Sequence, residues 1–265
     1  MQLSGNIIKM KTVLKNVVEY QLPIGQQFLP LNDLIGQEIK LSYNGQINCV
    51  KCGRRTKTSF QQGFCFPCFQ SAPEADPGII RPELDQAHLG ISRDMEWAKK
   101  YSLTEHVVYL AVSSGLKIGV TRASQYTTRW MDQGAIKAII LAKTPYRQLA
   151  GLIEVELKEY FADKTNWRQM LSNKIDGDIN LEEEKNKAAG LLSNDLQQYL
   201  DEEDYITNIS YPVNQYPQKI KSINLEKNPV YSGILAGIKG QYLMFEDQHV
   251  INIRKYSGYF IGIDY

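Results

Sequence analysis

The chain has 265 residues, of which 22% are charged, and a net charge of +1 at pH 7. This length allows one to three domains with a sizeable core, and the near-neutral charge excludes a globally basic nucleic-acid-binding protein. No apolar run reaches the ~18 residues that a membrane helix needs, and the N-terminal segment lacks the apolar centre of a signal peptide. We therefore expect a cytoplasmic protein without membrane contact.

The first 45 residues alternate polar side chains with Ile, Val, Leu and Tyr, which is typical of strands. We expect strands over 6–15, 17–23 and 38–42.

Four cysteines form two CxxC pairs, Cys49 with Cys52 and Cys65 with Cys68, separated by twelve residues. Four thiolates in two chelating pairs suit tetrahedral Zn²⁺, and in a reducing compartment they favour a metal over disulfides. Because protein fills all four positions, we expect a structural zinc rather than a catalytic one. A redox role for a CxxC pair is the alternative.

The segment from Cys49 to Cys68 is basic, with four bases, no acid and therefore a net charge of +4. It also carries aromatic side chains, and basic groups beside aromatic ones are typical of nucleic-acid surfaces. The residues concerned are Lys51, Arg54, Arg55, Lys57, Phe60, Phe64, Phe66 and Phe69. The alternative is that the phenylalanines pack around the metal in a module too small for a core of its own.

Prolines and glycine punctuate residues 70–104 and predict an irregular connector. The next segment, HVVYLAVSSGLKIGVT at residues 106–121, predicts a β-hairpin around a three-residue turn. In that register Tyr109 pairs with Gly119 and Ala111 with Lys117. Since side chains alternate between faces, one face is wholly apolar and the other carries Tyr109 and Lys117. That second face is either half-solvated or part of a functional site.

After the hairpin, the pattern predicts a short helix over 126–130, a strand over 136–142 and a helix over 147–161. The residues of interest along this stretch are Tyr109, Lys117, Arg129, Glu154 and Asn166. Their order resembles that of the GIY-YIG nuclease domain, over roughly residues 105–170. The two naming tripeptides correspond here to VVY, ending at Tyr109, and KIG, which has Lys117 in place of a tyrosine.

The resemblance implies a metal-dependent cleavage of phosphodiesters. It implies that Glu154 binds Mg²⁺ or Mn²⁺, that Tyr109 orients or deprotonates water, and that Arg129 and Lys117 stabilise developing charge. Asn166 matches a late asparagine of that family, although its alternative role is to cap a helix. Nine bases against five acids from 117 to 168 give a local charge of +4. The nucleic-acid contacts that we expect are Lys51, Arg54, Arg55, Lys117, Arg122, Arg129 and Arg168.

Residues 172–204 predict an acidic surface helix, preceded by an Asp176-Gly177-Asp178 loop that lacks the complete EF-hand pattern. The remaining chain returns to strands, at 205–213, 233–238, 241–245, 250–254 and 259–263. Residues 4–11 and 232–239 are weakly similar in sequence, since both begin with Ser-Gly and end with lysine. This similarity suggests that the two ends of the chain pair.

Over nearly its full length the chain resembles a bacterial family known as domain of unknown function 2797. Segments that carry this resemblance include CVKCGRR, GFCFPCF, KIGVTR, RWMDQGA and DKTNWRQML. Relatives suggest a second metal near His88, but the matching positions here are Gly78 and Asp85, which leaves a second zinc open. The family implies no activity of its own.

We expect an α+β protein with three parts: a four-cysteine zinc module, a GIY-YIG-like three-stranded antiparallel sheet with flanking helices, and a β-rich domain built from both chain ends. The expected boundaries are 1–45, 46–104, 105–204 and 205–265. Three functions stay open: a divalent-metal-dependent endonuclease acting on DNA or RNA, a non-cleaving nucleic-acid-binding protein, and an interaction scaffold with purely structural zinc.

Overall fold

The computed structural model describes residues 1–161, 165–175 and 178–265. Asp163, Lys164, Asp176 and Gly177, which belong to segments discussed above, lie outside these residues. The chain divides into two compact units, and each is described by itself. Unit 1 comprises 1–70, 171–173 and 210–265, and unit 2 comprises 71–170 and 174–209.

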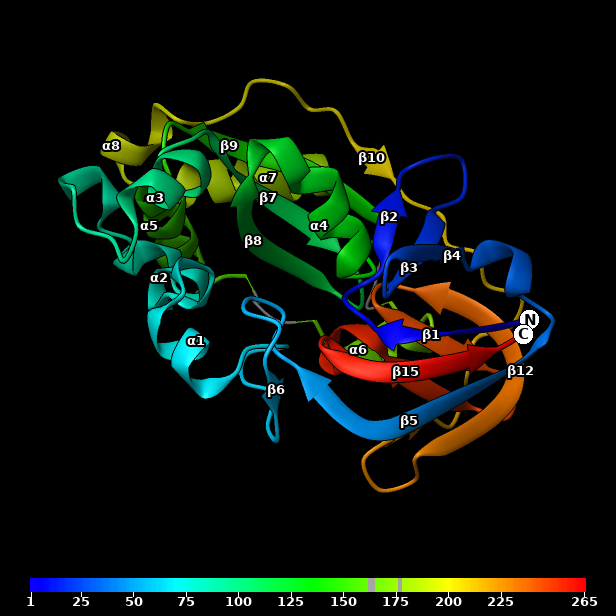
Figure 1. Ribbon diagram of the computed structural model, residues 1–265. Coiled ribbons are helices and arrows are strands. Elements are labelled where there is room, and N and C mark those ends of the chain that lie inside the picture. Colours follow the sequence, from blue (N-terminus) through cyan, green and yellow to red (C-terminus); the bar gives the residue numbers. More distant parts are fainter. Residues whose placement is uncertain (162–164, 176–177) are drawn as a thin grey trace. The chain divides into compact units, whose positions relative to one another are not determined.

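Unit 1 is built on a mostly antiparallel sheet that takes strands from both ends of the chain (Figure 1). The strand order is β1-β15-β5-β12-β13-β14-β11, and β6 pairs with β5. The strands are β1 (Gln2–Asn6), β5 (Glu38–Asn48), β6 (Arg55–Thr56), β11 (Lys221–Ser222), β12 (Val230–Lys239), β13 (Tyr242–Phe245), β14 (His249–Asn252) and β15 (Tyr259–Asp264). The two chain ends lie side by side, because Tyr265 N donates to Met1 O at 2.9 Å.

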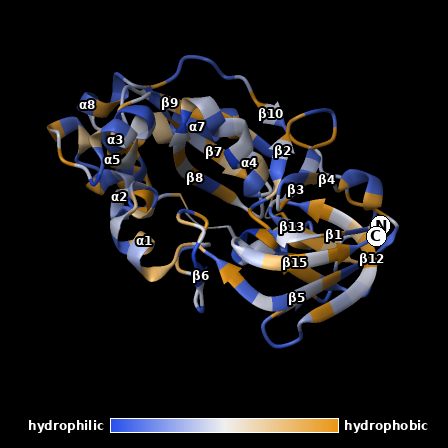
Figure 2. Cartoon of the chain, in the orientation of Figure 1, coloured by the Kyte–Doolittle hydropathy of each residue, from blue (hydrophilic) through white to orange (hydrophobic). Residues whose placement is uncertain are grey.

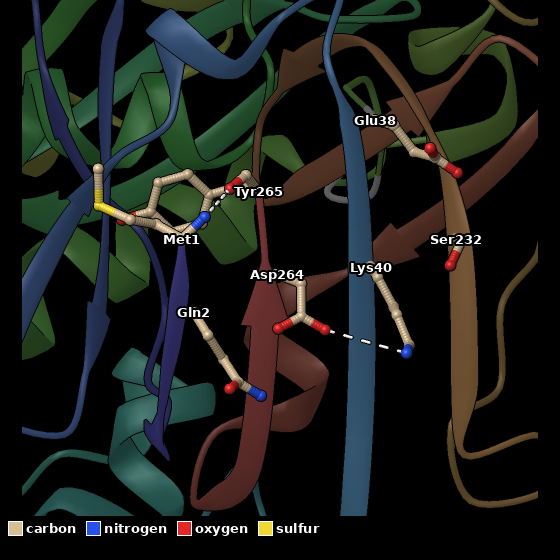
Figure 3. A pocket seen from close by; sticks show the side chains of 7 residues that line it. All are labelled: Met1, Gln2, Glu38, Lys40, Ser232, Asp264 and Tyr265. Carbon is tan, nitrogen blue, oxygen red and sulfur yellow. Dashed lines mark hydrogen bonds and ion pairs between the residues drawn. The ribbon is translucent and has the colours of Figure 1, made fainter.

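Alternation between buried and exposed side chains explains why these segments form a sheet. Along β5, for example, Ile39, Leu41 and Ile47 are buried, and Figure 2 shows the matching bands of hydrophobic and hydrophilic residues. On the opposite side, one polar row crosses four neighbouring strands, from Gln2 through Asp264 and Lys40 to Ser232. This row lines a shallow depression, in which Lys40 Nζ and Asp264 Oδ2 lie 4.0 Å apart (Figure 3).

A smaller antiparallel sheet, in the order β2-β3-β4, completes unit 1 together with short helices. Its elements are β2 (Lys11–Val13), β3 (Glu19–Ile24), β4 (Gln27–Pro30), η1 (Asn32–Leu34), α1 (Phe66–Ser71) and η6 (Ile253–Tyr256). The single strand predicted over 6–15 is wrong, because the chain leaves the large sheet after Asn6 and joins the small sheet at Lys11. The predicted strands over 38–42 and 233–238 are both longer in the structure.

Unit 2 contains a four-stranded antiparallel sheet in the order β10-β9-β7-β8. The strands are β7 (His106–Val112), β8 (Leu116–Arg122), β9 (Lys137–Thr144) and β10 (Thr207–Asn208). The helices are η2 (Pro73–Ala75), α2 (Pro77–Ile80), η3 (Pro82–Leu84), η4 (Ala87–Leu89), α3 (Met95–Tyr101), η5 (Ala123–Gln125), α4 (Tyr126–Asp132), α5 (Arg147–Leu157), α6 (Trp167–Leu171), α7 (Leu181–Leu191) and α8 (Asn194–Gln197).

Three predictions for this region need correction. The strand predicted over 205–213 is reduced to β10, which pairs with β9 and gives this sheet a fourth strand. The helix predicted over 147–161 ends at Leu157. The connector before β7 is not irregular throughout, since its short helices pack on α5 so closely that a Cβ at Gly151 would lie 2.3 Å from Glu83 N.

The hairpin has the predicted register, with Tyr109 opposite Gly119 and Ala111 opposite Lys117. Its apolar face, which includes Val108, packs against Ala150, Ile153 and Leu157 of α5 in one buried cluster. The other face is buried as well, because α4 covers it: Tyr109 and Trp130 are 0% and 1% exposed. A half-solvated hairpin is therefore wrong, and the polar groups of this face are enclosed.

Candidate metal centre and the Tyr109 site

The four cysteines come together at the end of β5 and the start of α1. A tight turn follows Cys49: Gly53, at φ +72°, donates its N–H to Cys49 O at 2.9 Å, and Cys49 N donates to Arg54 O at 2.9 Å. A side chain disfavours this backbone conformation, which is why glycine occupies position 53. The turn places Cys52 beside Cys49, while Cys65 and Cys68 lie one helical turn apart.

The sulfur positions fit a tetrahedral metal. All four Sγ atoms lie within 4.8 Å of one another, and those of Cys52 and Cys65 are 3.8 Å apart. Zinc–sulfur bonds of about 2.3 Å in a tetrahedron require sulfur atoms about 3.8 Å apart. The cysteines are free thiols, so the set can bind a metal such as zinc.

The surroundings of the cysteines favour a thiolate at Cys49 and a protonated thiol at Cys68. Burial raises the pKa of the Cys49 thiol, but hydrogen bonds from the N–H groups of Cys52, Cys65 and Lys51 outweigh it and lower that pKa to about 6. Burial and contact with the other sulfurs raise the pKa of Cys68 to about 12. Cys68 therefore keeps its proton unless a cation lies among the sulfurs, and a divalent metal would supply the charge that lets all four ionise.

The basic residues of this module lie at its surface, whereas most of its aromatic residues pack inside it. Lys51, Arg54, Arg55 and Lys57 are exposed. The phenylalanines pack on one another around the cysteines, with the Phe60 ring centroid 5.4 Å from that of Phe66 and 5.8 Å from that of Phe69. Phe64 is buried, whereas Phe66 stays 50% exposed. Arg54 is hydrogen-bonded to Cys52, which raises the pKa of its guanidinium. The four cations thus reach the surface, and most of the aromatic surface is used within the module.

In unit 2, the Tyr109 ring lies directly over Gly119. A Cβ at position 119 would be 2.6 Å from the Tyr109 hydroxyl oxygen, so no larger residue fits there without movement. The hydroxyl donates to Gln133 Oε1 at 2.9 Å, at the end of α4. The hydroxyl end of the ring is therefore fixed by two neighbours, Gly119 and Gln133.

Two other residues of the predicted site, Arg129 and Glu154, change the pKa of this phenol. Burial raises the pKa of Tyr109, the guanidinium of Arg129 on α4 opposes that rise, and the negative charge of Glu154 on α5 adds to it. Arg129 and Glu154 also both act on the charge of Arg147, so the two side chains lie in the same part of unit 2. Both side chains are half-buried.

The other predicted residues are less central. Lys117 shares the face of Tyr109 and is 4% exposed. Asn166 caps α6, because its Oδ1 accepts from Gln169 N at 3.3 Å, and its own N–H donates to Ser114 Oγ in the hairpin turn at 3.2 Å. Arg122 stacks on Tyr101, with its guanidinium carbon 4.6 Å from the ring centroid.

Arg168 is exposed and stacks on its neighbour Trp167, with 4.2 Å from the guanidinium carbon to the ring centroid. Its other polar atoms remain open to a partner. It belongs to unit 2, as do Lys117, Arg122 and Arg129, whereas the basic residues of the cysteine module belong to unit 1.

A second metal site near His88 has no ligand set among the described residues, where the four cysteines are the one group of three or more metal-binding side chains. His88 stacks on Tyr146, with ring centroids 5.0 Å apart. Both carboxylate oxygens of Asp85 accept hydrogen bonds, one from Ala87 N and the other from Ser102 Oγ. Gly78 does lie against Asp85, since a Cβ at Gly78 would be 3.4 Å from that of Asp85, but glycine offers no ligand.

Sequence patterns missed Arg147, which anchors the first turn of α5. Its Nε and Nη2 donate to the carbonyls of Gly78 and Ile79 at 2.8 and 2.7 Å. Burial lowers the pKa of Arg147, and the negative charges of Asp85 and Glu154 partly offset this decrease. Its acceptors are backbone carbonyls far away in sequence, and such partners leave no side-chain signal that a sequence pattern would reveal.

Fold and site together define a two-unit α+β protein with a cluster of four cysteines that can hold a metal. The sequence matches the family described as "Protein of unknown function (DUF2797)" over residues 36–261, and the chain therefore belongs to that family. Neither a functionally curated protein nor a solved structure shows a significant match. In the part of the chain that the structure describes, we find no helix with the length and apolarity to traverse a lipid bilayer.

Proposed function

We propose that this chain is a zinc-containing nucleic-acid-processing protein of the cytoplasm whose unit 2 is a GIY-YIG-like phosphodiester site. One observation carries the proposal: Arg129 and Glu154, on two different helices, both act electrostatically on the Tyr109 phenol of the hairpin. The order of hairpin, α4, β9 and α5 supports the resemblance. A cation and a carboxylate around a buried hydroxyl are groups that phosphodiester chemistry uses.

Each group has a distinct role in this proposal. Arg129 binds a phosphate oxygen, since a guanidinium offers several donors and keeps its charge. Glu154 would hold Mg²⁺ or Mn²⁺ through a carboxylate oxygen, and the ion would supply Lewis-acid stabilisation of the phosphate. Tyr109 stays a neutral phenol, because burial raises its pKa, and it positions its neighbours by hydrogen bonding rather than as a base.

The cysteine module would serve binding rather than chemistry. A closed four-thiolate zinc holds the turn from which Lys51, Arg54 and Arg55 project into solvent, where they would contact phosphates. Arg168 would add to the surface charge of unit 2, whereas Lys117 is 4% exposed, so the expected contact of this residue with nucleic acid is wrong. The free thiols are consistent with a reducing compartment.

A second candidate, binding without cleavage, is favoured by the burial of Tyr109. The side chain is 0% exposed, so a substrate phosphate would reach Arg129 and Glu154 but not the phenol. A protein that keeps the basic groups and encloses the hydroxyl would bind a backbone and leave it intact.

A cleavage assay on the full chain separates the two candidates. Labelled single- and double-stranded DNA and RNA are incubated with wild type, with Glu154→Gln and with Glu156→Gln, in Mg²⁺ or Mn²⁺. Glu156 is the matched control, because it lies on the same helix but its carboxylate accepts from Ser193 N and Oγ. Cleavage that Glu154→Gln abolishes and Glu156→Gln keeps supports the enzyme. Binding with no cleavage by any form supports the binding protein, and neither binding nor cleavage would leave only an interaction scaffold.

A further inference from the structure

A pocket of 360 Å³ lies in unit 1 beside β11, the last strand of the large sheet. Its walls come from β11, the following turn, the start of β12 and the start of β14. The lining residues that carry its chemistry are Ser222, Ile223, Lys227, Val230, Tyr231 and His249. The volume falls within the range of about 300–1,000 Å³ that is usual for small-molecule sites.

Asp247, which does not line the pocket itself, holds the His249 ring in position. Asp247 Oδ2 lies 2.7 Å from His249 Nδ1, and Asp247 Oδ1 accepts from the Tyr231 hydroxyl at 2.8 Å and from His249 N at 3.2 Å. Burial raises the pKa of Asp247, but the bonds from Tyr231 and His249 outweigh it and lower that pKa. The carboxylate therefore only accepts, so Nδ1 donates to it, and Nε2 is the ring nitrogen that Asp247 does not engage.

The charge of the lining favours an anion. Lys227 supplies an ammonium, and none of the pocket's eight lining residues, all of them described, is acidic. The Asp247 carboxylate already accepts three hydrogen bonds, from the Tyr231 hydroxyl and from the backbone and ring nitrogens of His249. Nearby, Glu226 Oε1 accepts from the Tyr259 hydroxyl. Apolar surface is also present, since Ile223, Val230 and the Tyr231 ring line the same space.

We propose that this pocket binds a small organic phosphate monoester, with the phosphate between Lys227 and His249 and the organic part on Val230 and the Tyr231 ring. A monoester is the anion that matches both polar groups. One negative oxygen meets the ammonium, and a second oxygen pairs with Nε2, because a phosphate monoester can either accept a hydrogen bond there or donate its P–OH. An ionised carboxylate can only accept, and Ser222 offers the phosphate a further hydroxyl. The site involves neither the cysteines nor Tyr109, so it is independent of the proposed nucleic-acid function.

Three probes with the same ring test the proposal on the full chain: phenyl phosphate, benzoate and phenol. Binding is followed by amide chemical shifts of residues 222–231 and 249 and by calorimetry. We expect phenyl phosphate to shift these amides and to bind more tightly than benzoate, and phenol not to bind. Benzoate binding as tightly as phenyl phosphate would overturn the phosphate assignment, and no binding of phenyl phosphate would overturn the site.

Two lysines provide a matched pair of variants. Lys227→Met should weaken phenyl phosphate about tenfold, as expected for loss of a charge-assisted hydrogen bond. Lys221→Met is the control, because Lys221 is equally exposed and pairs with His249 through the backbone but does not line the pocket. His249→Gln should weaken binding as well. Equal affinities of wild type and Lys227→Met, or an equal loss in the two lysine variants, would contradict the proposal.

Discussion

Tyr109 and Gly119 are cross-strand partners in which the tyrosine ring occupies the space of the missing side chain. The hydroxyl oxygen and Cζ of Tyr109 would lie 2.6 and 2.7 Å from a Cβ at position 119. Such a contact fixes the position of the ring over β8. It also explains why the phenol reaches Gln133 on α4 rather than solvent.

Gly119→Ala should destabilise the protein by about 1–3 kcal/mol, because the added methyl group overlaps the Tyr109 ring. Urea denaturation of the full chain measures this loss. Adding Tyr109→Phe should recover part of it, since the nearest overlapping atom is then removed. Gly190→Ala in α7 is the control: nothing lies within 4 Å of its Cβ, so the change should be neutral or stabilising. Equal effects at the two glycines would contradict the tight packing.

His106 makes the stability of the fold sensitive to acid. Burial lowers its pKa to about 4; Thr104 O accepts from its ring, while Arg147 and Arg122 disfavour its charged form. An unfolded histidine binds a proton below about pH 6.5, while the folded one does so only near pH 4. Stability is therefore lost as the pH falls through this window, by up to about 3 kcal/mol from this residue.

Unfolding free energies at pH 7 and pH 4.5 test this for wild type and for His106→Gln. We expect the difference between the two pH values to be smaller in His106→Gln than in wild type. An unchanged difference would show that other groups, and not His106, govern the acid sensitivity.

Elemental analysis of protein purified without chelator should find about one zinc per chain, because a four-thiolate tetrahedron holds a single ion. Cys52→Ser should lose the metal and unfold the surrounding module, since metal binding supplies folding free energy there. Lys57→Ala, on the same loop but without a sulfur, should keep the zinc. A Cys49–Cys52 disulfide in reduced protein, or no bound metal, would refute the site.

Local patterns predicted a good part of the fold. The alternation of side chains along residues 106–121 was sufficient to predict the register of the hairpin and its apolar face, because both depend on neighbours in sequence. The spacing of the cysteines likewise indicated the cluster. The burial of the second hairpin face was not predictable, since it depends on how α4 docks. The pairing of β10 with β9 was missed for the same reason: two residues carry too little pattern to identify a partner strand.

Order along the chain was enough to choose the residues of the proposed site, but not to predict what surrounds them. Tyr109, Arg129 and Glu154 were singled out from their order, whereas Gln133 and Arg147 were not. The pocket at His249 was missed because Asp247, Tyr231 and Lys227 have no ordered spacing that a motif would show. Their convergence follows from the pairing of β11 with β14 and of β12 with β13.

The most direct test of the proposed function is the salt dependence of nucleic-acid binding by the full chain, measured as fluorescence anisotropy with labelled DNA and RNA. Affinity should fall steeply with salt as counterions are released, and Arg129→Ala should lower the slope of log affinity against log salt by about 1. Arg93→Ala is the matched control, because that guanidinium is committed to Asp76 and to Ala72 O. The proposal predicts an unchanged slope for Arg93→Ala. No salt-sensitive affinity for any DNA or RNA, or equal slopes for wild type and Arg129→Ala, would contradict it.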